Sequence, residues 1–575
     1  MQVSKPLPKH PAARPLRWLR HPLTPWLVGV GLVLSFTNLY PLLELGWRAV
    51  TVDGVVSTEN LRWLASARVR TALGHSLFVS GAATLFALAS GLLLALLTAR
   101  TDVMLGRTVQ LAFLLPLVVP PQVLAIAWLQ WAGPVGYLQG GVRALLGLSG
   151  RLWSLYGPGG VIFLLTLFVL PIAFLTLAAG LQRIGREVEE AASLDGASTS
   201  AIWAYILLPL LRPHLSAAAL LCFLGALGNF GIPALLAIPA RYSTLPTLLY
   251  QEVVAFSSGG LGRAAALALL FGLPALLALW VQARLLGRSE SRPLGGEVET
   301  VRTPLKGWRW PLSLLLWLLT LLLIVGPLFA MSATALLRAY GLPLLPENLT
   351  LEHFHFILTL DRAQRAAWHS LLLASGAALL GACLAVVIGY ALSQLQGRII
   401  GVLRLVVELP YALPGLIFAL ALILVWLPSP LPGVSLYGTL WLLLLAYLGR
   451  FLAFALQPIG AAWRQLDPNL EEAARIDGAT LFQTLRFVLL PLVAPSVLAA
   501  VLLVFLQAFA ELTLSALLAG SGTETLGWLV FGLEQGGYTN EAAALGVLLV
   551  LALLGVAGLA TLTRWWTQKH ASQTL

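Results

Sequence analysis

Two glutamates at matching places in the chain are the first residues whose type and spacing point to a shared task. Glu190 opens the stretch EAASLDGASTSAIWAYILLPLLRP, and Glu472, 282 residues later (472 − 190), opens EAARIDGATLFQTLRFVLLPLVAP. Each glutamate supplies a charge at a fixed place, and the two alanines that follow it leave a small face that another surface can approach. Because these polar stretches recur in register between long apolar segments, they indicate a docking surface for a partner outside the membrane.

Polar residues inside apolar runs form the second group of candidates. Asn229 and Glu511 keep the same interval of 282 residues (511 − 229), and an ionisable residue at membrane depth is a functional hypothesis by default. If the two halves of the chain face each other, both residues line the outward part of a translocation path, with Pro233 and Tyr242 close to Asn229 in sequence. The alternative is structural: Asn229 and Glu511 form hydrogen bonds that lock a helix bundle, and Tyr242 is an ordinary surface contact.

The chain shows no constellation for catalysis and no metal-ligand spacing. His353 and His355 lie beside Glu352. If this stretch were a strand, both imidazoles would lie on one face, where they could bind a metal. The favoured interpretation is a solvated loop. A P-loop requires the motif G-x-x-x-x-G-K-[ST]. The chain is therefore predicted to be non-catalytic and to bind no cofactor, because none of its four lysines stands in that motif: Lys5, Lys9, Lys306 and Lys569.

The elements that position these residues are membrane-spanning helices. The chain is 59% hydrophobic and 10% charged, whereas an ordinary soluble protein is about 25% charged. Apolar runs of about 20 residues predict transmembrane helices rather than the short alternating strands of a barrel. We expect an all-α polytopic membrane protein with about twelve spans, near 26–46, 72–98, 108–132, 158–182, 213–236, 261–284, 311–332, 367–391, 404–427, 435–457, 495–518 and 539–563.

The net charge of +11 follows the expected topology and does not indicate nucleic-acid binding. The lysines and many arginines lie in the two tails and a mid-chain linker, and cytoplasmic flanks collect such residues. Both termini and the linker are therefore predicted to be cytoplasmic. The expected organisation is a tail over 1–25, a first repeat over 26–286, a linker over 287–309, a second repeat over 310–564 and a tail over 565–575.

The two halves match outside the polar stretches as well. His75-Ser76-Leu77 opens the second span, and His369-Ser370-Leu371 opens the eighth. The third span carries Pro116, Pro120 and Pro121, and the ninth carries Pro410 and Pro414. These prolines either kink helices that line a pore or are accommodated by packing. The chain is a parallel tandem repeat of six helices each, for which a path between the halves is expected.

Each polar stretch reads locally as a helix, a turn and a second helix. The first helix is predicted from Arg186 to Leu194, and Asp195-Gly196 forms the stop because glycine accepts the left-handed conformation. Ser198 or Thr199 is expected to cap the second helix. In the second copy, Asp467-Pro468 is the expected start and Asp477-Gly478 the stop.

Both stretches resemble the EAA signature of permease subunits of binding-protein-dependent ABC importers. The first copy matches Glu-Ala-Ala, three residues, Gly, nine residues, Ile-x-Leu-Pro throughout, and the second has Val488 in place of the Ile. The resemblance implies a type I permease fold in a bacterial inner membrane, with each stretch lodged in a groove of an ATPase dimer at the cytoplasmic face. ATP would be used by that partner, and a periplasmic binding protein would deliver the solute. The coupling residues implied are Glu190, Ala191, Ala192, Asp195, Gly196, Glu472, Ala473, Ala474, Asp477 and Gly478.

The expected solute is ferric iron, moved by alternating access. Two permease halves fused in one chain are similar to the ferric-iron uptake type, and the stretch 229–251 resembles the segment after the fifth span of that group. Related groups carry 2-aminoethylphosphonate, thiamine or polyamines, and these remain alternatives. A different class, the ion-coupled secondary transporter, needs an acidic or histidine relay inside the spans. Glu408 and Glu511 alone are too few residues to form such a relay.

Overall fold

The computed structural model describes residues 24–255, 259–286, 304–395, 397–428, 430, 433 and 435–571. Most of the predicted N-terminal tail, residues 287–303 of the predicted linker and the last four residues of the C-terminal tail lie outside the described residues. The positions of both termini relative to a membrane therefore stay predictions.

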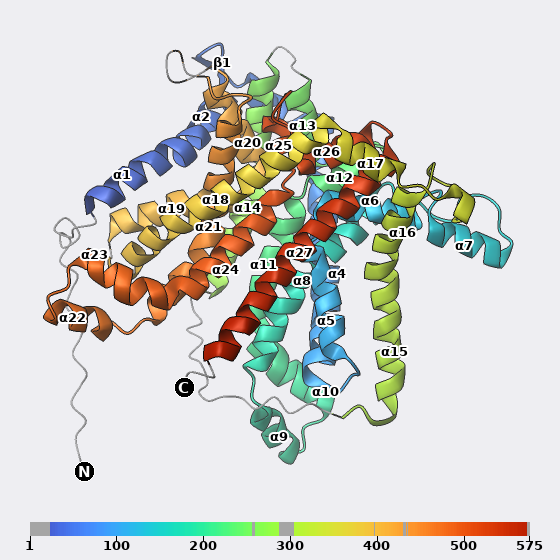
Figure 1. The fold of residues 1–575 in the computed structure, drawn as a ribbon, viewed down its shortest axis with the longest axis horizontal. Helices are drawn as coiled ribbons and strands as arrows, with labels where there is room; N and C mark the ends of the chain where they lie inside the picture. The colour runs from blue at the N-terminus through green and yellow to red at the C-terminus, as the bar shows by residue number, and fades with distance from the viewer. Residues whose placement is uncertain are drawn as a thin grey trace. The chain divides into compact units, whose positions relative to one another are not determined.

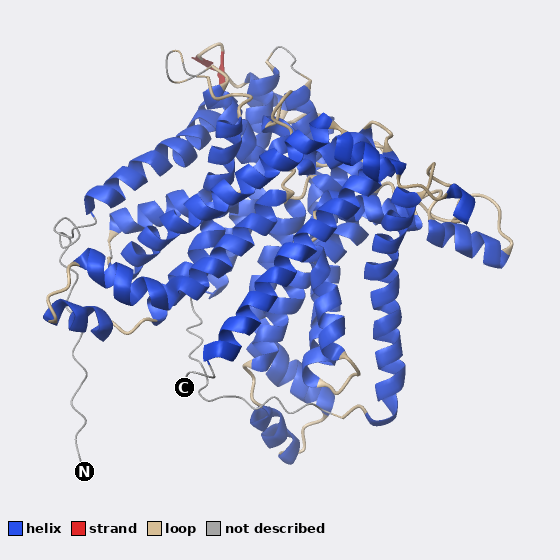
Figure 2. Cartoon of the chain, viewed as in Figure 1, coloured by secondary structure: helices blue, strands red, loops and turns tan. Residues whose placement is uncertain are grey.

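Helices make up nearly all of the regular structure, as expected for this fold class (Figure 2). Within the described residues, the only strand pair is a short antiparallel hairpin in which Thr51 pairs with Val56 and Val52 with Val55. In the first half the elements are α1 (Thr24–Leu34), η2 (Ser35–Leu39), α2 (Tyr40–Ala49), β1 (Thr51–Val52), β2 (Val55–Val56), α3 (Glu59–Trp63), α4 (Ala67–Arg100), α5 (Gly106–Leu114), η3 (Leu115–Leu117), α6 (Pro121–Ala132), α7 (Tyr137–Leu146), α8 (Pro158–Gln182), α9 (Arg186–Leu194), α10 (Thr199–Ile202), η4 (Trp203–Leu207), α11 (Leu208–Leu227), α12 (Gly231–Leu236), α13 (Leu245–Val254) and α14 (Gly260–Leu286).

The second half follows a similar order, without counterparts of β1, β2, η3 and α7 among the described residues. Its elements are η5 (Lys306–Trp308), α15 (Arg309–Thr320), η6 (Leu321–Val325), α16 (Gly326–Leu336), η7 (Pro346–Asn348), α17 (Glu352–Thr359), α18 (Asp361–Gln394), α19 (Arg398–Ala412), α20 (Gly415–Trp426), α21 (Leu440–Gln465), α22 (Asn469–Ile476), α23 (Leu481–Gln483), η8 (Thr484–Leu489), α24 (Leu490–Phe509), α25 (Ser515–Leu518), α26 (Leu526–Gln535) and α27 (Thr539–Ala571). Ten helices in the described residues are long and apolar enough to cross a membrane, or up to twelve if each of two broken pairs is one span. The prediction of about twelve spans is consistent with this range.

The helices gather into two compact units, each with its own internal packing. Met1–Pro41, Ser375–Tyr411 and Tyr447–Phe505 form the smaller unit, and Leu42–Ala374, Ala412–Ala446 and Leu506–Leu575 form the larger unit. Each unit draws residues from both sequence repeats. The predicted repeat boundaries stay predictions, because they were drawn from the repeated sequence and the two units are defined by packing.

The core of the larger unit is built on three long helices, α4, α8 and α11, which pack along one another (Figure 1). Small residues allow close contact: a Cβ added at Gly91 of α4 would lie 2.8 Å from the Cβ of Ala173 on α8. Gly180 of α8 likewise faces the His214 ring of α11, whose Cγ would lie 2.6 Å from an added Cβ. Helices in a membrane gain stability from such close backbone approach, since lipid provides little hydrophobic driving force between them.

Proline interrupts the third span and its counterpart. α5 with η3 and α6 with α7 form a pair bent by 111° at the break that contains Pro120. In the second half, α19 ends at Ala412 and α20 begins at Gly415, on either side of Pro414. Since proline lacks the N–H that continues a helix, these residues break the spans, and the expectation that the broken helices line a pore stays a prediction.

Two further breaks were not anticipated. The apolar runs that end near 236 and 518 suggest continuous spans, but α11 ends at Leu227 and α24 ends at Phe509. A short helix follows each break, α12 after Asn229 and α25 after Glu511. Hydropathy alone does not reveal such interruptions, because the residues on both sides are equally apolar.

Candidate functional site

The first polar stretch folds into the predicted helix, α9, and stops at Gly196. The Ala197 N–H donates to the Ala192 carbonyl over 3.0 Å, and the Gly196 N–H donates to the Ser193 carbonyl over 3.1 Å. Gly196 has a φ of +84°, in the left-handed region. This arrangement is a Schellman motif, which satisfies carbonyl groups at the end of a helix.

The second polar stretch, α22, ends in the same way. The Ala479 N–H donates to the Ala474 carbonyl over 3.0 Å, and the Gly478 N–H donates to the Arg475 carbonyl over 3.1 Å. Gly478 also has a φ of +84°. The start lies one residue later than predicted, at Asn469, where the Asp467 carboxylate accepts from the Asn469 N–H over 3.0 Å. We call α9 and α22 the motif helices.

The segment after each motif helix also repeats a feature that sequence does not signal. A short α-helical piece, α10 or α23, passes into a π-helical piece, η4 or η8, before the membrane helix continues. Ser198 accepts from the Ala201 N–H over 3.3 Å, as predicted for a cap, and Thr480 and Gln483 form a capping box. π-Helical turns are rare and occur often at functional sites.

Each motif helix presents a large apolar side chain to solvent just before its stop. Leu194 is 89% exposed and Ile476, at the equivalent position, is 85% exposed. Tyr205 and Phe487 form a second equivalent pair, with 81% and 68% of their surfaces exposed. Sequence reasoning overlooked both pairs, although an apolar residue before Asp-Gly in both copies was an available signal. Leu194 and Ile476 lie outside the helices long and apolar enough to cross a membrane, whereas Tyr205 and Phe487 lie within two of them, where lipid can cover an exposed apolar side chain.

The glutamate that precedes the motif glutamate anchors the first motif helix. Arg100, the last residue of α4, donates from Nη1 to Glu189 Oε1 over 2.7 Å. The same guanidinium donates from Nη2 to the carbonyls of Leu181 and Ile184 over 2.6 and 2.8 Å, at the end of α8. Arg100 therefore ties the ends of α4 and α8 to α9 with charge-assisted hydrogen bonds.

The second motif helix is anchored through the equivalent glutamate by different chemistry. The Tyr390 hydroxyl donates to Glu471 Oε1 over 2.9 Å, and Gln394 donates from Nε2 to Oε2 over 3.4 Å. Arg475 on the same helix also pairs with this carboxylate. Gln394 is the last residue of α18, just as Arg100 is the last residue of α4, and both helices have 34 residues. The available sequence signal was the Glu-Glu pair in both copies.

The intramembrane candidates Asn229 and Glu511 both cap short helices. Asn229 Oδ1 accepts from the Ile232 N–H over 3.1 Å. The Glu511 carboxylate accepts from the Leu514 N–H over 2.7 Å and from the Ser515 N–H over 3.1 Å. These hydrogen bonds are local, to backbone groups three or four residues along the chain, so both the bundle-locking interpretation and the role in a translocation path stay predictions.

Buried side chains fill the region around these two caps in the larger unit. Gln122 on α6 donates from Nε2 to the Ala510 carbonyl over 3.1 Å, which joins residues of both sequence repeats. The Phe230 ring lies 4.9 Å from Tyr250 and 5.7 Å from Phe531 between centroids. Pro233, a predicted path residue, is buried in α12 within this region. These contacts form one packed region in the larger unit, which joins residues of both sequence repeats.

Tyr242, the last predicted path residue, packs on the matched His-Ser motif. Its ring stacks on His75 with centroids 3.7 Å apart, and His75 Nδ1 lies 2.9 Å from the Ser243 carbonyl. The next residue, Ser76, accepts from the Leu245 N–H over 2.7 Å. The pair therefore holds the loop between α12 and α13 against α4.

The second half uses its own His-Ser pair in the same way. His369 Nδ1 lies 3.0 Å from the Glu524 carbonyl, and Ser370 accepts from the Leu526 N–H over 2.8 Å. This repeated contact explains why the dipeptide recurs at the start of both long helices.

The expectation for His353 and His355 was wrong in its local structure. Both residues lie on helix α17 rather than on a strand or a solvated loop, so two positions of separation do not place them on one face. His353 contacts Glu541 Oε1 over 3.2 Å and the Leu337 carbonyl over 3.0 Å. In the part of the chain that the structure describes, no group of three His, Cys, Asp or Glu residues is placed to hold a metal ion.

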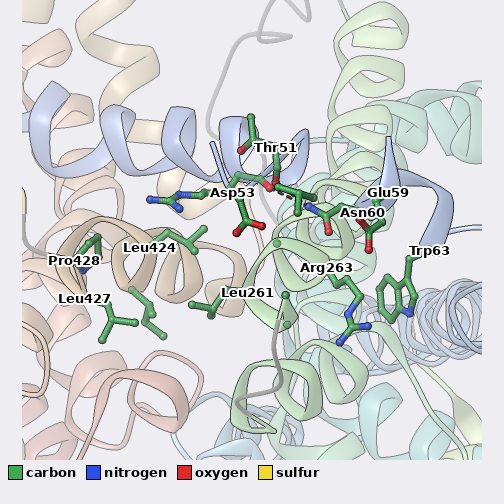
Figure 3. Close-up of a pocket in the computed structure, with 16 residues that line it drawn as sticks. Thr51, Asp53, Glu59, Asn60, Trp63, Leu261, Arg263, Leu424, Leu427 and Pro428 are labelled. Carbon is green, nitrogen blue, oxygen red and sulfur yellow. Dashed lines mark hydrogen bonds between the residues drawn. The ribbon is translucent and has the colours of Figure 1, made fainter. Parts of the chain in front are cut away.

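A cavity of about 580 Å³ opens in the larger unit beside the β1–β2 hairpin (Figure 3). Asp53 and Glu59 lie on one side of it, and the Arg263 guanidinium lies 5.9 Å from the centroid of the Trp63 ring. Asn60 donates to the Thr51 carbonyl over 3.1 Å and so fixes the hairpin to α3. The lining carries charges of both signs, and sequence reasoning did not anticipate it.

A carboxyl group at the end of α26 has an unusual environment. Burial raises the pKa of Glu534 to about 7, although a hydrogen bond from Thr539 opposes the shift. Among the described residues, no hydrogen-bond partner reaches its buried Oε2. Burial, and next the negative charge of Glu534, raises the pKa of Tyr156.

Comparison with known proteins places this geometry in context. The family model described as "Binding-protein-dependent transport system inner membrane component" matches residues 89–290 and 378–569, so it occurs twice. Each matched range contains one motif helix.

Relatives named for different transport systems align with the chain. The probable ABC transporter permease protein y4fN of Sinorhizobium fredii is 29% identical over 79% of this chain and 80% of its own length. The ferric transport system permease protein FbpB of Actinobacillus pleuropneumoniae is 24% identical over 92% of this chain and 76% of its own length. A putative 2-aminoethylphosphonate transport system permease protein, PhnV of Salmonella choleraesuis, is 28% identical over 39% of this chain and 84% of its own length. A solved structure of a bacterial alginate ABC transporter bound to its periplasmic protein aligns over 48% of this chain and 96% of its own chain, with 19% identity and a TM-score of 0.40.

Proposed function

The chain belongs to the binding-protein-dependent transport system inner membrane components, and we propose that this ABC importer permease carries ferric iron. The support for ferric iron is the relative named for ferric transport, which aligns over 92% of this chain. The relative named for 2-aminoethylphosphonate aligns over 39%, which makes phosphonate the second candidate solute.

The observation that carries the coupling role is the duplicated motif helix. α9 and α22 share their hydrogen bonds, their left-handed glycine and their exposed apolar residue, Leu194 or Ile476. A short exposed helix gains nothing from presenting such a residue to water. A groove in a separate ATPase subunit would bury this apolar side chain and fix the position of each motif helix.

The proposed mechanism is alternating access driven by that ATPase. A loaded periplasmic binding protein docks on the loops expected outside, and ATP closes the ATPase dimer and draws the motif helices with it. The packed region around Phe230, Gln122 and Phe531 then opens so that solute enters, and hydrolysis returns the permease to the packed state. Asn229 and Glu511 stand in that region as the proposed path residues.

The test is purification of the tagged chain from its native membrane after trapping with ATP and vanadate. We expect an ATPase subunit to co-purify, together with a soluble binding protein whose bound metal is ferric iron. A binding protein that holds a phosphonate instead would replace the solute and keep the importer. Absence of any ATPase under all nucleotide conditions would refute the coupling role.

A double variant, Leu194→Ser with Ile476→Ser, sharpens the same experiment. Burial of each side chain contributes about 1.5–3 kcal/mol, so loss of both should weaken ATPase retention by at least tenfold. Leu145→Ser is the matched control, because Leu145 is 84% exposed on α7, on the side expected to face the periplasm. Equal retention by the double variant and the control would contradict docking through these residues.

A further inference from the structure

We propose that α4 is a rigid link that carries movement of the first motif helix to the opposite end of the larger unit. The inference rests on the proposed coupling role and adds to it the residues that transmit the movement. Both ends of α4 are attached by named contacts, one to α9 and one to the loop before α13. The two joints are Arg100–Glu189 at one end and His75-Ser76 at the other.

The joint at the motif helix is a short hydrogen bond between two charged side chains. Arg100 is the last residue of α4, and its guanidinium holds Glu189 over 2.7 Å and two carbonyls at the end of α8. The exposed fractions of the Arg100 and Glu189 side chains are 19% and 32%, so water screens the pair only in part. Any displacement of α9 must therefore move the ends of α4 and α8 or break these bonds.

The joint at the other end holds the segment that leads into α13. Ser76 accepts from the Leu245 N–H over 2.7 Å, and Ser76 is 2% exposed. Arg68, in the first turns of α4, pairs with Glu252 of α13 over 2.9 Å. Tyr250 on α13 contacts Phe230, which lies in the packed region around Asn229. Movement of α4 therefore reaches this packed region of the larger unit.

The helix between the joints is suited to transmit force. Ser76 and Arg100 are 24 residues apart (100 − 76), about 36 Å along the helix, and α4 has no internal proline, whereas α8, α11 and α14 each contain one. Its close contact with α8 at Gly91 braces it along its length. Since sharp kinks arise mostly at proline, α4 lacks the commonest cause of a bend.

The second half repeats both kinds of contact on α18. α18 also has 34 residues, holds Glu471 through Tyr390 and Gln394 at one end, and holds the Leu526 N–H through Ser370 near the other. The chemistry of the inner joint differs, because a phenol and an amide replace the arginine. Two independent solutions to the same attachment indicate that the attachment itself matters.

A buried thiol reports the movement without knowledge of the solute. In a chain with Cys222 and Cys383 replaced by alanine, Ala234→Cys places a thiol in α12, where the native alanine is fully buried. The complex with its ATPase is treated with a membrane-impermeant maleimide, with and without ATP and vanadate. We expect trapping to raise the labelling rate about tenfold, since the rate follows the open population.

Two link variants and one control then test the proposal. Ser76→Ala removes the joint near α13, and Glu189→Gln removes the charge at the joint near α9. Ser90→Ala is the matched control, because Ser90 lies on α4 and its hydroxyl donates only within that helix, to Phe86 and Ala87. Both link variants should lose most of the trapping response, while Ser90→Ala keeps it. ATPase activity of the Ser76→Ala complex should equal that of the background, because the change lies far from the motif helix.

The outcomes separate the link from the coupling role. If the background responds to trapping and Ser76→Ala responds equally, α4 is not the link. If Glu189→Gln releases the ATPase, the Ser76→Ala result alone decides. If no ATPase co-purifies with the background and its labelling never changes, the proposed function fails and the link fails with it.

Discussion

At the scale of single residues, glycine at the end of each motif helix is the most restrictive requirement. Gly196 and Gly478 both adopt a φ of +84°, and no atom lies within 4 Å of an added Cβ at either position. Substitution there is therefore opposed by the backbone conformation and not by crowding.

The first prediction concerns these glycines. Gly196→Val with Gly478→Val should cost about 1–2 kcal/mol at each turn, because a β-branched residue disfavours the left-handed region. The turn then unwinds, and both ATPase retention and uptake fall. Gly74→Val is the matched control, since Gly74 also meets no atom within 4 Å and lies in the regular helix α4. Normal uptake by the double variant would refute the coupling assignment.

The second prediction concerns Glu534 and pH. Its folded-state pKa is raised by burial from 4.5 to about 7, so between these values the folded chain holds a proton that the unfolded chain has released. This group therefore makes the free energy of unfolding fall as pH rises from 4.5 to about 7. Above about pH 7 the carboxylate is charged in both states, and the whole destabilisation by its burial is present. Glu534→Gln should stabilise the protein at about pH 8 by up to about 3 kcal/mol and have little effect near pH 4.5.

The measurement is the thermal unfolding midpoint in detergent at both pH values. Glu347→Gln is the control, because Glu347 is an exposed carboxylate. An equal shift for the two variants, or the same shift at both pH values, would contradict the assignment to burial of Glu534.

At the scale of elements, the contrast between broken and unbroken helices organises the molecule. The third span and its counterpart are interrupted at prolines, and short capped helices follow α11 and α24. α4 and α18 each run for 34 residues without interruption. The broken elements supply the packed region around Asn229 and Glu511, and the unbroken ones connect the ends.

The third prediction tests the contact between two such elements. Gly91→Val should destabilise the protein by about 1–3 kcal/mol, because its Cβ would lie 2.8 Å from that of Ala173 and force α4 from α8. Gly81→Val on the same helix meets no atom within 4 Å and should leave stability unchanged. The thermal unfolding midpoints of the two variants test this prediction. Equal midpoints would show that α4 and α8 accommodate the larger side chain without loss of stability.

At the scale of the whole molecule, the question is what drives transport. The family match occurs twice in one chain, so one polypeptide supplies both halves of a permease. None of the four lysines of the sequence stands in a P-loop motif, so the proposed energy source is a partner.

The fourth prediction follows from that division of labour. Vesicles that contain the complex and its binding protein should accumulate ferric iron when ATP is present and ionophores have collapsed the ion gradients. A variant of the partner ATPase that binds but does not hydrolyse ATP is the control and should abolish accumulation. Uptake that survives loss of ATP and stops when the gradients collapse would instead identify a secondary transporter.

The sequence by itself determined the fold class, the span number and the two motif helices. Those features depend on hydropathy and on local backbone preferences, which are written in neighbouring residues: Gly196 and Gly478 stop their helices wherever the rest of the chain lies. Repetition at a constant interval made the assignment specific, because chance does not repeat a glycine, two alanines and a proline in register.

Only the tertiary structure decided what the remaining candidates contact. Asn229 and Glu511 cap short helices, His353 contacts Glu541, and Glu189 reaches Arg100 across 89 residues of chain. The Glu189 and His353 contacts join residues far apart in sequence. The caps are local, but they depend on helix breaks that apolar residues on both sides conceal. The attachment of α4 at both ends belongs to the same group, since it becomes visible only when α9, α13 and α4 are placed together.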